Sequence, residues 1–362
     1  MEIEISQVVL QILLDKTGHL LQTKDLKPIL TNYFVSAEDG VVTVVGSNLE
    51  LSVTAQTDNV EVKETGNVLL PAGVFSNIIK SIGDKEVILL SVKDSRVVVK
   101  AKGAKWEFAT NTAVDEYPQL PDYEVDSKLM VDKGDFLEKV SKVLIAVSRD
   151  TKRPQMQLVN FSDNLMVASD GAQYQEAAFD FSGSMVIPLL VLEELVRFLK
   201  LSHCEHFTIG QSENIISVLA DGDCFVGAKS VADFPDVSRI KDAVSENSSI
   251  VSAQKSILLN AIRRVMILSN QETNAVKLSV SEDSGVFSCE DKFGNQAKES
   301  ITLFYDGEPR DLQVNGNFFI KLLESSTSPD IQLYLGEDVG MRKSYIQLKE
   351  ENHIGIISQI VG

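Results

Sequence analysis

The chain has 362 residues, of which 44% are hydrophobic and 24% are charged, and its formal net charge is −18. This is the composition of a folded globular protein, and the length predicts two or three domains rather than one small core. The acidic charge argues against nucleic acid as a partner unless the basic side chains gather on one surface.

The stretch from Lys24 to Val53 has an ordered series of local signals. It predicts strands at 32–35 and 41–45 around the turn Ala37-Glu38-Asp39-Gly40, because an acidic residue followed by glycine favours a turn between apolar strands. The phrase Gly46-Ser47-Asn48-Leu49-Glu50-Leu51 follows the second strand. The order of these signals makes the stretch unusual.

The same order of elements is predicted three times along the chain. Apolar periodicity predicts an opening helix in each third, at 6–15, 134–148 and 254–269. Paired strands follow, and a second helix is then entered through similar phrases at 70–75, 187–190 and 314–318. Two more strands complete each unit, for example at 87–92 and 97–101. Aromatic-proline linkers at 115–120 and 232–237 close the first two units, so we expect domains at 1–124, 125–246 and 247–362, each of about 120 residues.

Strands outnumber helices, and two helices beside two small antiparallel sheets in each unit indicate an α+β fold with three tandem domains. The stretch at 24–53 and the linker Phe234-Pro235-Asp236 resemble the bacterial DNA polymerase III beta subunit, the replication sliding clamp, and the resemblance covers the whole chain. It implies a homodimer closed head to tail into a ring, with the helices lining the hole. It also implies a processivity factor that encircles duplex DNA and binds the polymerase and the clamp loader through short peptide motifs, without a cofactor. The competing hypothesis is an acidic, self-associating scaffold that keeps the fold without a DNA role.

Basic side chains recur on the predicted helices, opposite the apolar stripes. In helix 134–148, Phe136, Val140 and Val143 fall on one side while Lys139 and Lys142 fall on the other. Lysine and arginine are ordinary solvent-facing residues, but the same placement in several units of an acidic chain favours a lining that faces DNA phosphates. With the position that the resemblance adds just before Pro28, the expected DNA-binding residues are Lys24, Lys80, Lys139, Lys142, Arg149, Lys152, Arg153, Arg197, Lys200, Arg263, Arg264 and Lys321.

No motif predicts catalysis, so we expect that the protein is not an enzyme and holds no metal. The segment 222–230 is close to a phosphate-binding loop, but Ala228 stands where a lysine should follow the second glycine. His203-Cys204-Glu205-His206 lacks the second ligand cluster that a structural zinc site requires. Asp221 with Asp223 is better explained by a hairpin turn than by a metal pair.

The cellular setting is predicted from what the sequence lacks. No basic-then-apolar signal opens the chain, and the apolar run at 185–192 ends at Glu193, too short to span a membrane. Three cysteines without a pairing pattern indicate a reducing environment. We therefore expect a cytoplasmic protein with no membrane partner.

The resemblance also implies a hydrophobic pocket for partner peptides between the second and third domains. Carried over position by position, its residues are Met156, Ser169, Gly171, Ala172, Gln173, Tyr174, Pro235, Arg239, Ile240, Thr273, Asn315, Phe318, Ile356, Ser358 and Ile360. Two departures from the family pattern stand out. Ala172-Gln173-Tyr174 replaces the usual aromatic or histidine, arginine and apolar residue, and Ser358 to Gly362 replaces a tail rich in methionine and proline.

The subunit interface is expected where clamps present an edge strand of the first domain to the third. Lys105-Trp106-Glu107-Phe108 alternates as a strand, which nominates Trp106 and Phe108, and the end of the third unit's first helix nominates Ile267 and Leu268. A head-to-tail ring requires such a heterologous contact. The alternative is that Trp106 fills the core of its own domain.

Overall fold

A computed structural model describes residues 1–21, 27–93, 95–110, 113–118, 127–181, 183–241, 248–336 and 345–360 of the chain. Lys24 and the expected domain boundaries at 124/125 and 246/247 lie outside the described residues. The boundaries therefore stay a prediction.

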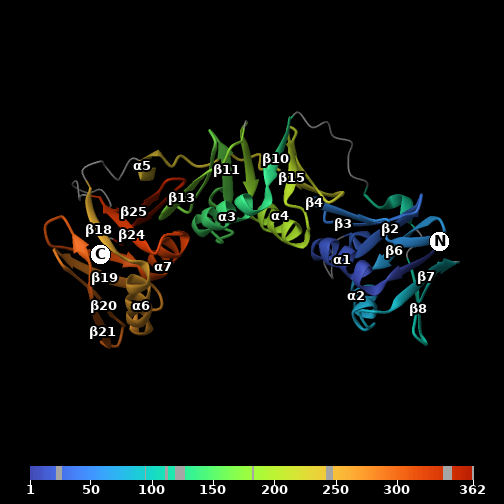
Figure 1. Ribbon diagram of the computed structural model, residues 1–362, viewed down its shortest axis with the longest axis horizontal. Helices are drawn as coiled ribbons and strands as arrows, with labels where there is room; N and C mark the ends of the chain where they lie inside the picture. Colours follow the sequence, from blue (N-terminus) through green and yellow to red (C-terminus); the bar gives the residue numbers. More distant parts are fainter. Residues whose placement is uncertain are drawn as a thin grey trace. The chain divides into compact units, whose positions relative to one another are not determined.

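The predicted order of elements is present three times (Figure 1). The first series is β1 (Glu2–Ser6), α1 (Gln7–Thr17), β2 (Asn32–Glu38), β3 (Val41–Ser47), β4 (Leu51–Thr57), β5 (Val60–Glu64), β6 (Gly66–Pro71), α2 (Ala72–Lys80), β7 (Val87–Lys93), β8 (Arg96–Ala101) and β9 (Ala104–Ala109). The second series is β10 (Ser127–Asp132), α3 (Lys133–Val143), β11 (Leu158–Ser162), β12 (Leu165–Ser169), β13 (Gln173–Ala178), β14 (Met185–Pro188), α4 (Leu189–Leu201), β15 (His206–Gln211), β16 (Ile215–Ala220) and β17 (Asp223–Ala228).

A short helix, α5 (Ser238–Lys241), precedes the third series. That series is β18 (Ser249–Gln254), α6 (Lys255–Val265), β19 (Ala275–Ser281), β20 (Ser284–Glu290), β21 (Gln296–Thr302), β22 (Phe304–Tyr305), β23 (Arg310–Asn315), α7 (Gly316–Ser325), β24 (Asp330–Leu335), β25 (Tyr345–Glu350) and β26 (His353–Ser358). The α+β class is confirmed.

Local chemistry explains where several elements begin and end. The predicted turn between β2 and β3 is confirmed, because Asp39 and Gly40 both have positive φ, 49° and 79°. Ser6 caps α1 by accepting a hydrogen bond from the Val9 backbone N–H. Asn315 caps α7 by accepting from two backbone N–H groups. The helix predicted at 134–148 is shorter in the structure, because α3 ends at Val143 and a 3-10 turn follows it. Beyond this turn the backbone hydrogen-bonds outside the helix, to the Met156 carbonyl.

The chain packs as two compact units, and each brings together two of the three series. The first unit holds Met1–Gly134 with Leu190–Lys229. It contains a five-stranded sheet, β5-β1-β7-β8-β9, and an eight-stranded sheet, β10-β15-β16-β17-β4-β3-β2-β6. All neighbouring strands are antiparallel, and β4 pairs with β17, so the eight-stranded sheet is continuous from the first series into the second. Helices α1 and α2 pack together and bury Leu10, Leu14, Phe75 and Ile79 in the core beneath the strands.

The second unit holds Asp135–Leu189 with Ser230–Gly362. Its nine-stranded sheet has the order β14-β11-β12-β13-β26-β25-β24-β18-β22, and a four-stranded sheet has the order β21-β20-β19-β23. The pairing of β13 with β26 joins the second and third series, as β4 and β17 do in the first unit. Helices α6 and α7 pack together over a core that includes Phe287 and Phe319. In the described part of the chain, no helix is long and apolar enough to cross a membrane.

A buried ion pair joins the two series of the first unit. Lys16, in the last turn of α1, places Nζ 2.5 Å from Oδ2 of Asp223 at the start of β17, and the side chains are only 7% and 2% exposed. The other carboxylate oxygen of Asp223 accepts from the Gln56 backbone N–H at 2.9 Å. Asp221 and Gly222 form the predicted hairpin turn, with φ of 55° and 86°. Asp223 leaves that turn and enters the core, which the sequence did not reveal.

We expect replacement of Asp223 by alanine to destabilise the first unit by about 3–5 kcal/mol, because it leaves a buried ammonium group without a counter-charge. Urea unfolding of the intact chain measures this loss. The control is Lys63→Ala, which removes an exposed pair with Glu4 and should leave the unfolding curve nearly unchanged. Equal effects of the two variants would show that the Lys16–Asp223 pair does not hold the unit together.

Candidate binding surfaces

Apart from Lys24, which lies outside the described residues, the basic residues expected to face DNA are on helices and in one loop. Lys80 is on α2, Lys139 and Lys142 on α3, Arg197 and Lys200 on α4, Arg263 and Arg264 on α6, and Lys321 on α7. Arg149, Lys152 and Arg153 follow α3 in a loop. All are exposed except Lys139 and Lys142, which are half-buried.

Several of these cations are already paired with carboxylates. Lys139 contacts Asp135 at 2.7 Å, and Lys142 contacts Glu138 at 3.0 Å. The arginine pairs are Arg197–Glu194 at 3.4 Å, Arg263–Glu324 at 2.5 Å and Arg264–Glu299 at 2.7 Å. A DNA phosphate that binds one of these residues must therefore take the place of a carboxylate. Such an exchange gives little net affinity, which suits a surface that moves along DNA.

The residues expected to form the peptide pocket lie in two groups in the second unit. In the first group, Ser169 donates to the Gln173 carbonyl at 2.7 Å, and Gly171 has φ of 86°, which fixes a tight turn after β12. The methyl group of Met156 lies just beyond Gly171. Val167, Tyr174, Ile240 and Ile356 form one buried apolar cluster beside this turn.

The second group lies at the start of α7. Asn315 donates through its side-chain amide to the Thr273 carbonyl at 3.1 Å, and Phe318 packs against the core under α7. The end of the chain connects the two groups. The Ser358 N–H donates to the Ala172 carbonyl at 2.8 Å, and the Ile360 N–H donates to the Gln313 carbonyl at 2.8 Å. Of the remaining predicted residues, Pro235 is half-buried and Arg239 is exposed.

Tyr174 occupies the place where the family pattern has an apolar residue, and its hydroxyl has its own partner. It donates to Glu176 on the same strand, and Lys241 of α5 lies 3.3 Å from that carboxylate. Burial raises the pKa of Tyr174 well above its usual range. The contact with Glu176 raises this pKa further, by a smaller amount. Sequence reasoning missed Glu176 and Lys241, although the spacing of Tyr174 and Glu176 along a strand places them on one face.

The expected interface residues lie on an edge strand and on an exposed turn. Strand β9 is an edge of the five-stranded sheet, as the resemblance to clamps implied. Trp106 and Phe108 are half-buried and pack against the core of the first unit, so part of each side chain serves its own core. Ile267 is 76% exposed and Leu268 is 37% exposed, in the 3-10 turn Met266–Leu268 after α6.

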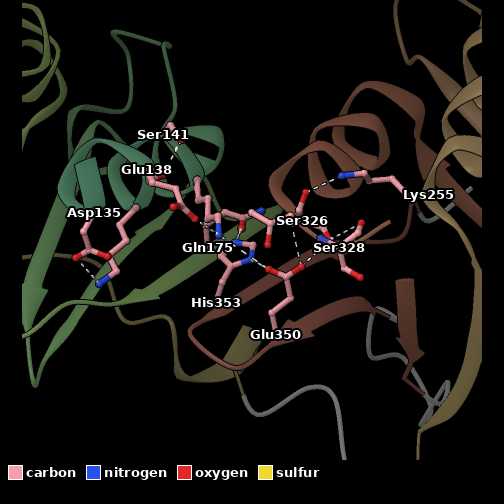
Figure 2. A network of polar contacts seen from close by, with 12 residues as sticks. Asp135, Glu138, Ser141, Gln175, Lys255, Ser326, Ser328, Glu350 and His353 are labelled. Atoms are coloured by element: carbon pink, nitrogen blue, oxygen red, sulfur yellow. Dashed lines mark hydrogen bonds and ion pairs between the residues drawn. The ribbon is translucent and has the colours of Figure 1, made fainter. Parts of the chain in front are cut away.

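A polar network includes Gln175 of β13, His353 of β26, Glu350 of β25 and Ser326 after α7 (Figure 2). His353 is 3% exposed, and its Nε2 lies 2.7 Å from the side-chain oxygen of Gln175. Glu350 accepts from the Ser326 hydroxyl at 2.5 Å and lies 3.9 Å from Lys142 of α3. A polar pocket of about 490 Å³ lies beside the network, lined by α3, residues 327–328 and the turn between β25 and β26. The network thus ties α3 to strands of the third series.

Burial lowers the pKa of His353 to about 4, so the folded protein keeps this imidazole neutral. The unfolded chain binds the proton near the ordinary value of about 6.5, so stability is full above that pH and falls as the pH drops towards 4. We expect the free energy of unfolding to fall by about 2 kcal/mol between pH 7 and pH 5 because of His353. In His353→Gln the loss over this range should be smaller by that amount. Identical pH dependence of the two proteins in urea unfolding would contradict the assignment.

Within the described ranges, no group of three or more histidine, cysteine, aspartate or glutamate side chains could hold a metal ion. The segment after α4 that carries His203 and Cys204 is organised by Asp221, whose carboxylate accepts from both backbone N–H groups, at 2.5 and 3.0 Å. Burial raises the pKa of the Cys204 thiol. This segment is a connector between a helix and a strand.

Comparison with solved structures shows that the fold is that of sliding clamps. The chain matches the sliding clamp of Pseudomonas aeruginosa bound to griselimycin with a TM-score of 0.91 at 17% identity, covering 100% of both chains. It matches the DNA polymerase III beta subunit of Thermotoga maritima with a TM-score of 0.88 at 20% identity, covering 100% of this chain and 99% of that one.

Sequence comparison then gives the family. Residues 1–121 match the model of the DNA polymerase III beta subunit N-terminal domain, and residues 245–353 match the model of its C-terminal domain. The beta sliding clamp of Haemophilus influenzae is 23% identical over 345 residues, covering 92% of this chain and 93% of the relative. That of Escherichia coli K12 is 22% identical over 323 residues, covering 86% and 87%. The chain belongs to the DNA polymerase III beta subunit family.

Proposed function

We propose that this sliding clamp is a processivity factor that closes as a homodimeric ring around duplex DNA in the cytoplasm and tethers a replicative polymerase. The observation that carries the proposal is the match to sliding clamps over the full length of the chain, with family models at both ends. The acidic scaffold hypothesis has no comparable support. A closed ring stays on DNA because it cannot leave sideways, so strong chemical affinity is unnecessary.

The proposed contacts with DNA are the exposed cations of the helices and of the loop after α3. Their pairing with carboxylates supports contacts that form and break easily, because each phosphate replaces an existing partner. Phosphate contacts carry no sequence information, which fits a protein that must pass over any sequence. Lys24 stays part of the proposal, although it lies outside the described residues.

Replacing Lys139, Arg149, Lys152, Arg197 and Arg263 together with glutamate should weaken loading onto nicked circular DNA about tenfold or more and flatten its dependence on salt. The physical reason is the loss of counter-ion release at each phosphate contact. Lys63→Glu, which changes an exposed lysine on strand β5 outside the proposed set, is the matched control. Unchanged retention of the fivefold variant on nicked circles would defeat the DNA assignment.

The proposed partner site is the pocket formed by the turn at 169–174, the linker residues Pro235 and Ile240, the start of α7 and the chain end. The bridging hydrogen bonds of Ser358 and Ile360 support a role for the tail in shaping it. Its occupants are short apolar peptides of the polymerase and of the clamp loader, since few anchor residues dominate such sites.

Deleting Ser358 to Gly362 should abolish most polymerase stimulation while sedimentation still shows a dimer, because Ser358 and Ile360 bond to Ala172 and Gln313 of the second unit, beside the proposed pocket. Ile360→Asp, which keeps the tail in place, should have the same direction of effect by putting a charge among apolar anchors. Val231→Asp, at a residue that is 95% exposed, is the control and should stimulate normally. If the truncated chain still binds its partners as tightly as the intact one, the pocket lies elsewhere.

For closure of the ring we propose a contact between the β9 edge, with Trp106 and Phe108, and the turn with Ile267 and Leu268 of the partner copy. An unpaired edge strand is open to pairing with another chain. The large exposed fraction of Ile267 supports an apolar contact there, since it is left without cover in the single chain.

A further inference from the structure

The polar pocket beside His353 has the size of a small-molecule site. Its volume of about 490 Å³ is within the range of pockets that hold small ligands. In Figure 2, His353 lies between Glu138 of α3 and Glu350 of β25. The charged groups of the lining are the carboxylates of Asp135, Glu138, Glu350 and Glu351 and the ammonium groups of Lys139 and Lys142. This pocket is therefore charged, unlike the apolar site proposed for peptides.

Both lysines in the lining are already paired with carboxylates. Nζ of Lys139 lies 2.7 Å from Asp135. Nζ of Lys142 lies 3.0 Å from Glu138 and 3.9 Å from Glu350, so one ammonium group is shared between two carboxylates. An anion that entered the pocket would have to displace a carboxylate from one of these lysines. The charges therefore do not favour an anionic ligand.

The carboxylates of the lining outnumber its lysines by two, four against two. One excess negative charge arises where Glu138 and Glu350 share Lys142. The other is on Glu351, which is exposed and forms no ion pair within the part of the chain that the structure describes. Like charges in one pocket repel each other, and two positive charges on a ligand would relieve that repulsion.

His353 presents an unpartnered nitrogen in the same lining. Its Nε2 lies 2.7 Å from the side-chain oxygen of Gln175, which only accepts, so the proton of the neutral ring is on Nε2. Nδ1 then has a free lone pair, and no donor among the described residues reaches it. The side chain is 3% exposed, and a buried acceptor without a donor costs free energy. The ligand group that suits Nδ1 is therefore a hydrogen-bond donor.

One ammonium group can serve both acceptors at this end of the pocket. Nδ1 of His353 and Oε2 of Glu350 lie 3.9 Å apart. A nitrogen about 2.8 Å from each would join them at an angle of about 90°, near the tetrahedral spread of ammonium N–H bonds. A metal ion lacks such a fit, because no group of three or more histidine, cysteine, aspartate or glutamate side chains in the described ranges could hold one.

We propose that this pocket binds a short aliphatic diamine, with one ammonium group between His353 and Glu350 and the other at Glu351. Its two positive charges match the two excess carboxylates, and its N–H groups supply the donor that Nδ1 lacks. The hydroxyl groups of Thr327 and Ser328, which also line the pocket, are further acceptors. The inference concerns a site apart from the proposed peptide pocket and does not depend on the role on DNA.

The test is calorimetric titration of the intact chain with putrescine, butylamine and butanediol at one low ionic strength and at about pH 7.5, where amines are protonated. These probes share a four-carbon chain and carry two, one and no positive charges. We expect one putrescine site per chain. Butylamine should bind about tenfold more weakly or less, because it lacks one charge-assisted set of hydrogen bonds. Butanediol should give no measurable heat of binding.

Two variants locate the site. Glu351→Gln removes an exposed carboxylate, so it leaves the fold intact, and Glu350→Gln removes the partner of the buried nitrogen. Each should weaken putrescine binding about tenfold, since each deletes one charged acceptor. Glu38→Gln, at an exposed residue of β2 in the first unit, is the matched control and should bind as the wild type does.

The alternative outcome is a diffuse attraction of cations to a chain with a net charge of −18. If Glu351→Gln and Glu350→Gln keep the full affinity for putrescine, or if butylamine binds as tightly as putrescine, the inference is wrong. Loading onto nicked circular DNA is measured separately, so the proposed function stands or fails independently of this result.

Discussion

The ion pair between Lys16 and Asp223 is the constraint on which the first unit depends. Two charged groups that are almost fully buried are tolerated only when each satisfies the other, and Asp223 gains a backbone N–H as well. The pair fixes the end of α1 against β17, at the place where β17 joins β4. Backbone pairing of β4 with β17 makes the eight-stranded sheet continuous, and the ion pair holds the end of α1 beside that junction.

In the second unit, different polar residues connect two successive series of elements. Its continuous sheet is joined at β13 and β26, where Gln175 of β13 contacts His353 of β26, and Lys142 of α3 lies 3.9 Å from Glu350 of β25. In both units, polar side chains from two successive series pair under a shared sheet. Such pairs fix how the two strands at the junction are aligned, because a hydrogen bond requires a particular distance and angle between two atoms. Apolar packing alone is less specific.

The distribution of charge reconciles an acidic chain with DNA. Sequence reasoning predicted cations on the helices, and Lys80, Lys139, Lys142, Arg197, Lys200, Arg263, Arg264 and Lys321 are helix residues. The structure adds that many of them already have carboxylate partners, so the surface presents paired charges rather than a strongly positive face. A ring that relies on topology gains from this arrangement, since it avoids strong contacts that would slow its movement.

Local signals in the sequence were enough for the elements and their order. The Asp39-Gly40 turn, the start of α1 and the apolar stripe of α3 each depend on neighbours within a few residues, and each was predicted. Lys16 and Asp223 lie 207 positions apart, and Gln175 lies 178 from His353. Periodicity contains no information about such partners. The partner of the Tyr174 hydroxyl is a different case, because Glu176 lies two positions away on the same strand and strand alternation places both side chains on one face.

The central claim is that two copies close into a ring, and its direct test is retention on circular DNA before and after linearisation, with the mass in solution measured alongside. The account predicts a dimer that stays on a nicked circle and slides off once the circle is cut. Trp106→Ala combined with Ile267→Ala and Leu268→Ala should give a folded monomer that does not stay on the circle. A triple variant that remains dimeric at low concentration would place Trp106 in its own core alone, and retention of the wild type after cutting would contradict the ring.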